Sequence, residues 1–180
     1  LSDDTILIFT SDHGDCLTDH GHSQKWTMFE QITHVPLIFS GPSIQQDARV
    51  SELVQWMDIG PTILELAGCT PPKMEAISMV PALKGDQWQG RDYLFCEQVG
   101  DMVLTEVKFM SMIRSKYWKL IHYLDSEEGQ LYNLIDDPAE NENLWNHEAQ
   151  QSQKELLLSE LLNWRVESQL HHPTCWIYES

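Results

Sequence analysis

Two short apolar runs stand out near the start of the chain. Residues 5–10 (TILIFT) and 35–40 (VPLIFS) are dominated by Ile, Leu, Val and Phe, and both lead into polar or glycine-containing segments. A run that is apolar on both faces is typical of a parallel strand that helices cover on both sides. We therefore expect a central parallel strand at 5–10, a second strand at 35–40, and a short helix or ordered loop at 25–33.

A helix is predicted after the second strand. Asp58 suits the position before the first helical turn, Pro61 is tolerated within that turn, and Gly68 suits the position just beyond the last turn. Strands and helices alternate in this way up to about residue 80, and such alternation indicates an α/β layer architecture.

The pattern changes in the second half of the chain. Short aromatic or β-prone runs separated by turns predict a small antiparallel sheet, and they occupy residues 93–97, 109–114, 117–123 and 131–134. Residues 149–168 are the strongest predicted helix, with an apolar side formed by Leu157, Leu161, Leu162 and Trp164. We expect residues 1–85 to be part of an α/β domain and residues 86–180 to be an α+β subdomain with a tail, in which strands and a Leu-rich helix are core signals rather than chemistry.

The composition narrows the possible partners. The 180 residues are 42% hydrophobic and 22% charged, which is typical of a folded protein. A formal net charge of −17 argues against nucleic acid as a partner, because phosphate binding needs clustered Lys and Arg. No apolar run approaches the ~20 residues of a membrane span, so no membrane partner is expected. The four scattered cysteines form no C-x-x-C pair, which argues against a zinc knuckle.

The sequence opens on Leu1 rather than Met and enters the first apolar run almost at once. We therefore expect it to be the C-terminal part of a longer polypeptide, with the N-terminal half of that polypeptide as its partner. A missing leader then gives no information about the compartment.

Asp12 and His13, followed by Gly14, are the sharpest candidates for chemistry. They come directly after the first predicted strand, and open α/β sheets bind their ligands beyond the carboxyl ends of strands. A carboxylate beside an imidazole offers one oxygen and one nitrogen ligand to a divalent cation. An ordinary polar turn fits the spacing equally well.

Lys25 lies twelve residues after His13, beyond a segment rich in His and Gly. From the residues alone, a single Lys is more typical of a solvated surface cation than of a binding site. His20 and His22 share a glycine-containing loop, where histidines are more often structural or exposed, so we exclude them as ligands. His34 is expected to pack near the site at the start of the second strand.

The order and spacing of these residues closely resemble the second conserved block of the type I sulfatases, a family of the alkaline-phosphatase-like superfamily. The Asp-His pair is most similar to the iduronate-sulfatase and choline-sulfatase members. The block consists of residues 8–14, Asp19-His20-Gly21, Lys25 and residues 34–39. Weaker likeness extends over roughly residues 4–162, including 54–68, 78–85, 91–92, 114–121, 131–134 and 137–144.

The resemblance implies an alkaline-phosphatase-like sandwich fragment from an enzyme that hydrolyses sulfate esters. By the same resemblance, Asp12 and His13 would be metal ligands, and Lys25 would bind the sulfate group and stabilise charge on the leaving group. The family usually binds calcium (Ca²⁺), and the imidazole ligand leaves manganese (Mn²⁺) open.

The nucleophile of the family is a formylglycine, made from the Cys or Ser of a C/S-x-P-S/T-x-R motif in the N-terminal half. Cys69-Thr-Pro71 echoes this motif but lacks the Ser/Thr and the Arg, so we interpret Cys69 as structural. Without a nucleophile, the 180 residues alone are expected to be inactive.

The expected substrate is a small-molecule or saccharide sulfate ester. Two alternatives stay open: a phosphonate or phosphate ester hydrolase on the same scaffold, and a non-catalytic metal-binding or interaction module. An upstream reading frame that encodes the C/S-x-P-S/T-x-R motif would exclude the module.

Overall fold

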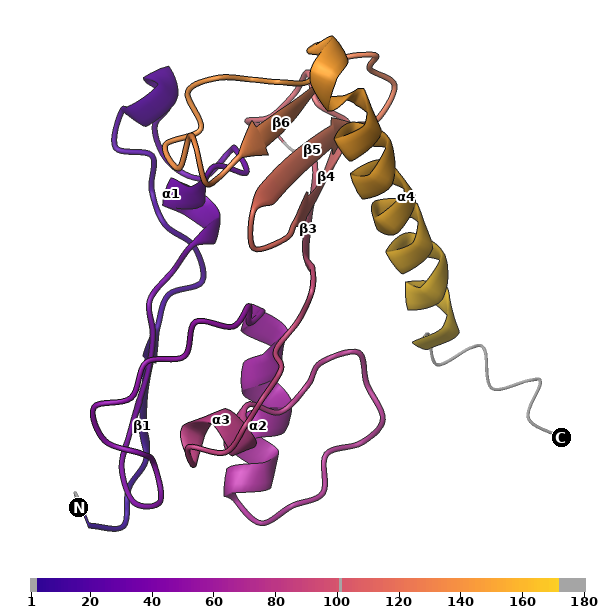
Figure 1. Cartoon of the computed structure of the whole chain (residues 1–180). Coiled ribbons are helices and arrows are strands. Elements are labelled where there is room, and N and C mark those ends of the chain that lie inside the picture. Colours follow the sequence, from indigo (N-terminus) through magenta and orange to yellow (C-terminus); the bar gives the residue numbers. More distant parts are fainter. Residues whose placement is uncertain (1–2, 101, 172–180) are drawn as a thin grey trace, which may run out of the picture. The chain divides into compact units, whose positions relative to one another are not determined.

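The chain divides into two compact units in the computed structural model, which describes residues 3–100 and 102–171 (Figure 1). Unit 1 comprises Leu1–Pro72 and Ala76–Asp92, and unit 2 comprises Lys73–Glu75 and Tyr93–Ser180. Within the described ranges, no helix has the length and apolar character to cross a membrane.

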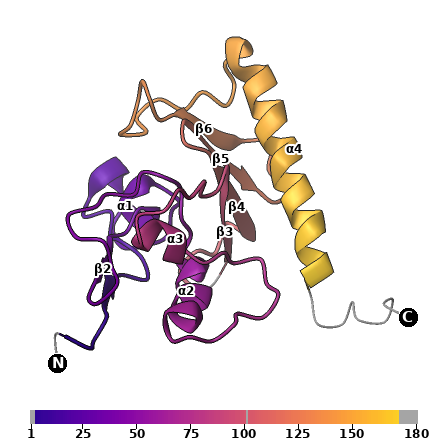
Figure 2. The same cartoon turned by 60° about the horizontal axis from the view of Figure 1, so that its bottom comes forward.

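A two-stranded ribbon forms one end of unit 1. Strands β1 (Leu7–Thr10) and β2 (Leu37–Ser40) pair antiparallel, with Leu7 opposite Ser40 and Thr10 opposite Leu37 (Figures 1 and 2). The prediction of a parallel strand is therefore wrong for this pair. The described segment between the strands holds only the 3-10 turn Asp19–Gly21 and the one-turn helix α1 (Glu30–Thr33), within the predicted 25–33. Antiparallel neighbours need no crossover helix, and an apolar run does not encode strand direction.

The ribbon also exposes part of its apolar surface. Leu7, Phe9 and Ile38 are 65%, 57% and 56% exposed, whereas their neighbours along each strand are partly buried. This alternation shows one open face, so the prediction that the strand is covered on both faces is wrong for the described residues of unit 1.

The predicted helix is confirmed as α2 (Ile59–Leu66), and a second short helix, α3 (Val80–Leu83), follows it. Pro61 lies in the first turn of α2, and Gly68 follows its end with a φ of 77°, a conformation that glycine adopts without strain. Thr62 accepts the backbone N–H of Met79 at 2.9 Å and donates to the Asp58 carbonyl at 2.6 Å. Thr62 thereby connects α2 to the residues before α3.

Asp58 does not cap α2 with its side chain, although it occupies the predicted position. Its fully buried carboxylate forms an ion pair with Arg91 and accepts the Arg91 Nε–H at 2.9 Å. The same carboxylate accepts the backbone N–H groups of Gln55 and Ile77 at 2.9 and 2.8 Å. Arg91 also donates its backbone N–H to the Leu53 carbonyl at 3.1 Å. Asp58 is therefore the residue that joins three separate segments of unit 1.

Unit 2 contains the predicted antiparallel sheet, which is confirmed. Neighbouring strands pair in sequence order, β3-β4-β5-β6. The strands are β3 (Leu94–Val99), β4 (Phe109–Arg114), β5 (Trp118–Tyr123) and β6 (Gly129–Asn133).

Helix α4 (Gln151–Glu167) lies along one face of this sheet, as Figure 2 shows, and confirms the long predicted helix. Leu157 and Leu161 are buried and Trp164 is partly buried, stacking on Phe95 with ring centroids 4.4 Å apart. Leu162 was assigned to the same apolar side but is 63% exposed, which makes that assignment wrong. The buried core between α4 and the sheet consists of Ile113, Leu120, Leu131, Trp145, Leu157 and Leu161.

A buried ion pair also belongs to unit 2. The Nζ atom of Lys119 on β5 lies 2.8 Å from Oε1 of Glu140, and both side chains are fully buried. Glu140 follows β6 and has a positive φ of 56°, so the loop bends to bring its carboxylate to the lysine.

Candidate functional site

Asp12 and His13 lie just beyond the carboxyl end of β1, as predicted. The Nδ1 atom of His13 is 2.7 Å from the Gly14 carbonyl, which can only accept, so Nδ1 carries the proton. In the neutral ring the lone pair is then on Nε2, which lies 3.6 Å from Oδ2 of Asp12. One carboxylate oxygen and one imidazole nitrogen are thus brought close together, and a neutral imidazole is the form that binds a metal ion.

The Asp12 carboxylate is also held in its charged form. The backbone N–H of His13 donates to Oδ1 of Asp12 at 3.0 Å, and this hydrogen bond is the main reason why the pKa of Asp12 lies below its ordinary value. Asp12 is 75% exposed and therefore accessible to an ion. Because calcium takes six to eight oxygen ligands, the pair can supply only part of a coordination sphere. Among residues 3–100 and 102–171, no cluster of three or more metal-ligating side chains occurs.

Gly14 ties this pair to the segment that carries α1. Its backbone N–H donates to the Ile32 carbonyl at 2.9 Å, and a Cβ atom at this position would lie 1.8 Å from the Gln31 carbonyl oxygen. No side chain fits there, so the glycine after Asp12-His13 is required by the close approach of two backbones.

Lys25 projects from a compact loop that follows Gly14. The backbone N–H of Cys16 donates to the Gln24 carbonyl at 3.1 Å, closing the loop at its base, and the Cys16 side chain is buried. Lys25 itself is exposed, with its ammonium 6.0 Å from the centre of the Trp26 ring. Lys25 is therefore a solvent-accessible cation, twelve residues after His13 in the sequence.

Asp15 is the residue of this region that the sequence reasoning missed. Its Oδ1 atom accepts the backbone N–H of Leu17 at 2.9 Å and that of Gln24 at 3.1 Å. An Asp side chain that accepts the backbone N–H two residues ahead is a recognised turn former. Asp15, directly after Gly14, is therefore a sequence signal for a turn at this point.

The other histidines of this region make contacts of different kinds. The His20 ring stacks on buried Phe29 with centroids 3.8 Å apart, which is a structural contact, and His22 is exposed. The side chain of His34 is 76% exposed, with Nδ1 3.5 Å from a carboxylate oxygen of Glu30. The prediction that His34 packs near the site is therefore wrong.

Two segments echo the C/S-x-P-S/T-x-R motif, and both lack its Arg. Cys69 is exposed in the loop after α2, so it is not part of the buried core. Ser40-Gly41-Pro42-Ser43 comes closer to the motif, but Gln45 stands where the Arg belongs. Ser40 is opposite Leu7 in the ribbon, which places it at the end of β1 away from Asp12.

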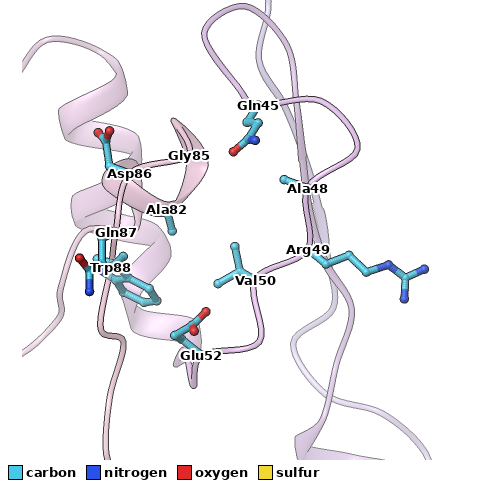
Figure 3. Close-up of a pocket in the computed structure, with 10 residues that line it drawn as sticks. All are labelled: Gln45, Ala48, Arg49, Val50, Glu52, Ala82, Gly85, Asp86, Gln87 and Trp88. Atoms are coloured by element: carbon cyan, nitrogen blue, oxygen red, sulfur yellow. The ribbon is translucent and has the colours of Figure 1, made fainter.

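A pocket of about 280 Å³ is lined by residues that follow β2 in the sequence and by residues in and after α3 (Figure 3). Val50 and Trp88 face each other across it, whereas the Arg49 side chain points away. Two backbone hydrogen bonds connect the segments that line it, from the Gln45 N–H to the Leu83 carbonyl and from the Arg91 N–H to the Leu53 carbonyl. The pocket is thus separate from Asp12 and His13 and contains none of the predicted site residues.

Comparison with known protein families gives one match over most of the chain. A family described as N-sulphoglucosamine sulphohydrolase, C-terminal, matches residues 18–167. Arylsulfatase K from Bos taurus is 34% identical over 149 residues, which are 78% of this chain and 27% of the relative. A Δ4,5-hexuronate-2-O-sulfatase from Bacteroides thetaiotaomicron is 34% identical over 146 residues, covering 78% of this chain and 30% of the relative.

Solved structures show the same fold. A 2-O GAG sulfatase superposes with a TM-score of 0.84 and 29% identity, over 92% of this chain and 37% of its own. A phosphonate monoester hydrolase of Agrobacterium radiobacter superposes with a TM-score of 0.82 and 28% identity, over 92% of this chain and 36% of its own. The chain therefore spans less than a third of the length of these two curated relatives and little more than a third of the two solved chains.

Proposed function

This chain belongs to the N-sulphoglucosamine sulphohydrolase C-terminal family, and on that premise we propose that it is part of an enzyme that hydrolyses sulfate esters. The observation that supports this most is the Asp12–His13 pair at the end of β1, where Nε2 of His13 lies 3.6 Å from a carboxylate oxygen of Asp12. The two relatives named as sulfatases that act on hexuronate or GAG suggest a saccharide sulfate as the substrate class.

Asp12 and His13 are proposed as two ligands of a divalent metal, calcium in the first place and manganese as the alternative. When bound, such an ion would neutralise the sulfate oxygens. The charged state of Asp12 and the Nδ1–H tautomer of His13 both suit this role. The remaining ligands and the formylglycine nucleophile are proposed to lie in an N-terminal half that the longer relatives contain.

Lys25 is proposed to bind the sulfate group. We expect Lys25→Ala in the full-length protein to lower kcat by about a hundredfold, because losing one preorganised donor to transition-state charge costs ~3 kcal/mol. Lys25→Arg should restore activity only partly, since a guanidinium does not replace a compact ammonium in a tight pocket. Steady-state kinetics with p-nitrophenyl sulfate measure the effect. Because Lys25 is exposed, its removal should leave the thermal midpoint unchanged. A wild-type kcat in a folded Lys25→Ala variant would show that Lys25 is a surface cation with no role in sulfate binding.

The central test compares the 180-residue chain with the full-length protein. The full-length protein should hydrolyse p-nitrophenyl sulfate, and the 180 residues alone should not, even with calcium or manganese added. The chain lacks a Cys or Ser in the formylglycine context, so no covalent nucleophile can form. Turnover by the chain freed of trace full-length enzyme would contradict the assignment of the nucleophile to another segment.

Phosphonate monoester hydrolysis is the second candidate, supported by the superposition on the Agrobacterium radiobacter enzyme. Parallel assays with p-nitrophenyl sulfate and p-nitrophenyl phenylphosphonate separate the two. A kcat/KM at least tenfold higher for the phosphonate would favour this second candidate over sulfate hydrolysis.

A further inference from the structure

We infer that Asp15 is a positioning residue that fixes the orientation of Lys25 by holding the backbone on both sides of the intervening loop. The inference rests on the proposed role of Lys25 in sulfate binding. Asp15 begins the loop, and its Oδ1 atom accepts one N–H from each arm, from Leu17 at 2.9 Å and from Gln24 at 3.1 Å. Gln24 is the residue directly before Lys25. The second hydrogen bond therefore holds the Ser23–Gln24 peptide, directly before the peptide that joins Gln24 to Lys25. The Gln24 carbonyl of that next peptide accepts the Cys16 N–H at 3.1 Å, so Asp15 and Cys16 together hold the two peptides that lead to Lys25.

The loop needs such a restraint because its backbone is unfavourable. The residues with positive φ are Leu17 (47°), Thr18 (81°), His20 (54°), Gly21 (74°) and Gln24 (65°). Side chains other than glycine occupy this region only when surrounding contacts hold them there. Gln24 combines a positive φ with the hydrogen bond to Asp15. Loss of the carboxylate would allow residue 24 to relax, and the side chain of Lys25 would turn with it.

The carboxylate can do this because its own position is fixed. Gly14, before Asp15, is bound to the Ile32 carbonyl and leaves no room for a side chain. Cys16, after Asp15, is 1% exposed, and its Sγ lies 3.5 Å from Oγ1 of Thr27. Asp15 is thus anchored on both sides between the Asp12–His13 pair and the loop. Asp15 therefore helps to set the position of the proposed sulfate-binding Lys25 relative to the proposed metal ligands Asp12 and His13.

The acceptor oxygen, rather than the negative charge, is what both hydrogen bonds use. Asn offers a carbonyl oxygen at the same place, whereas Ala offers none. Hydrogen bonds to a carboxylate are stronger than those to an amide, so Asn should support the loop slightly less well. Asp15→Asn is therefore the conservative variant, and Asp15→Ala is the disruptive one.

The experiment measures kinetics of five full-length variants with p-nitrophenyl sulfate: Asp15→Ala, Asp15→Asn, Asp86→Ala, Lys25→Ala, and Asp15→Ala combined with Lys25→Ala. We expect Asp15→Ala to lower kcat about tenfold with little change in KM, because a small misplacement of a group acting in the transition state is costly. Asp15→Asn should keep kcat within about threefold, and Asp86→Ala, which removes an exposed carboxylate far along the chain, should match the wild type. When Lys25→Ala is already present, adding Asp15→Ala should change kcat less than about twofold, since both act through one group.

Equal fold-losses with and without Lys25 would overturn the inference, because they would show that Asp15 acts independently of the lysine. Amide hydrogen exchange of residues 17–27 supplies a reading that needs no activity. Asp15→Ala should speed exchange at Leu17 and Gln24, whose N–H groups Asp15 accepts, by about tenfold or more, and Asp15→Asn should not. Unchanged exchange in Asp15→Ala would also overturn the inference. If the wild-type protein cleaves neither sulfate nor phosphonate esters, the proposed function fails, and the exchange result alone decides whether Asp15 holds the loop.

Discussion

Replacing Asp58 with alanine should lower the free energy of unfolding of unit 1 by about 3–5 kcal/mol, the usual loss when one partner of a buried ion pair is removed. The variant leaves the Arg91 guanidinium, 12% exposed, without its carboxylate partner. It also takes the acceptor away from the backbone N–H groups of Gln55 and Ile77. A buried donor that loses its acceptor costs about 1–3 kcal/mol, so both effects act in the same direction.

Urea denaturation followed by tryptophan fluorescence measures this loss, since Trp56 and Trp88 belong to unit 1. Glu65→Ala is the matched control, because Glu65 is an exposed acidic residue on α2. The control should change stability by less than about 0.5 kcal/mol. Asp58→Asn should lie between the two, since its amide oxygen still accepts from the backbone but carries no charge. A loss below about 1 kcal/mol in Asp58→Ala would show that the three segments are held by other contacts.

Replacing Asp12 with alanine should abolish both tight metal binding and turnover in the full-length protein. The carboxylate is 75% exposed and its described contacts are with the adjacent Ser11 and His13, so the fold has little dependence on it. Removing it also takes away the anionic half of the proposed ligand pair. An imidazole alone is a poor ligand for calcium, which binds oxygen atoms.

Metal content after dialysis, measured by atomic emission, and kcat with p-nitrophenyl sulfate test this prediction together. A chelator should lower the thermal midpoint of the wild-type protein, because an ion that binds only the native state stabilises it. The same chelator should have no effect on Asp12→Ala. Asp86→Ala should behave as the wild type in all three measurements. Stoichiometric metal and normal turnover in Asp12→Ala would remove Asp12 from the site.

The elements that sequence predicted best are those with a local cause. Helix α2 was recognisable because Asp58, Pro61 and Gly68 mark its ends, and the sheet of unit 2 because turns separate its β-prone runs. The prediction of strand direction is wrong because the apolar run that forms β1 contains no information about which strand pairs with it or in which direction. The prediction that Leu162 is on the apolar side is wrong for a related reason. A helix with three to four residues per turn brings several leucines near one face, and only packing decides which of them is exposed.

The candidate site was accessible from sequence only in part. Asp12 and His13 are adjacent, so a strand followed by two ligand-type residues revealed them. Asp58, which lies outside the candidate site, forms its ion pair with Arg91, a residue far away in the sequence. No local pattern predicts that pairing. For Asp15, the hydrogen bond from Leu17 is local, whereas the hydrogen bond from Gln24 forms only when the loop closes, and no local pattern predicts it.

The buried pair of Lys119 and Glu140 has a consequence for how this protein can evolve. A single replacement at either position would strand a charge in an interior where both side chains are fully buried, at a cost of about 3–5 kcal/mol. Replacement of both by apolar residues of similar volume is often neutral or stabilising. Descendants should therefore change the two positions together, as Lys with Glu or as an apolar pair. Covariation between a strand residue and a loop residue would be the trace that this contact leaves in sequences.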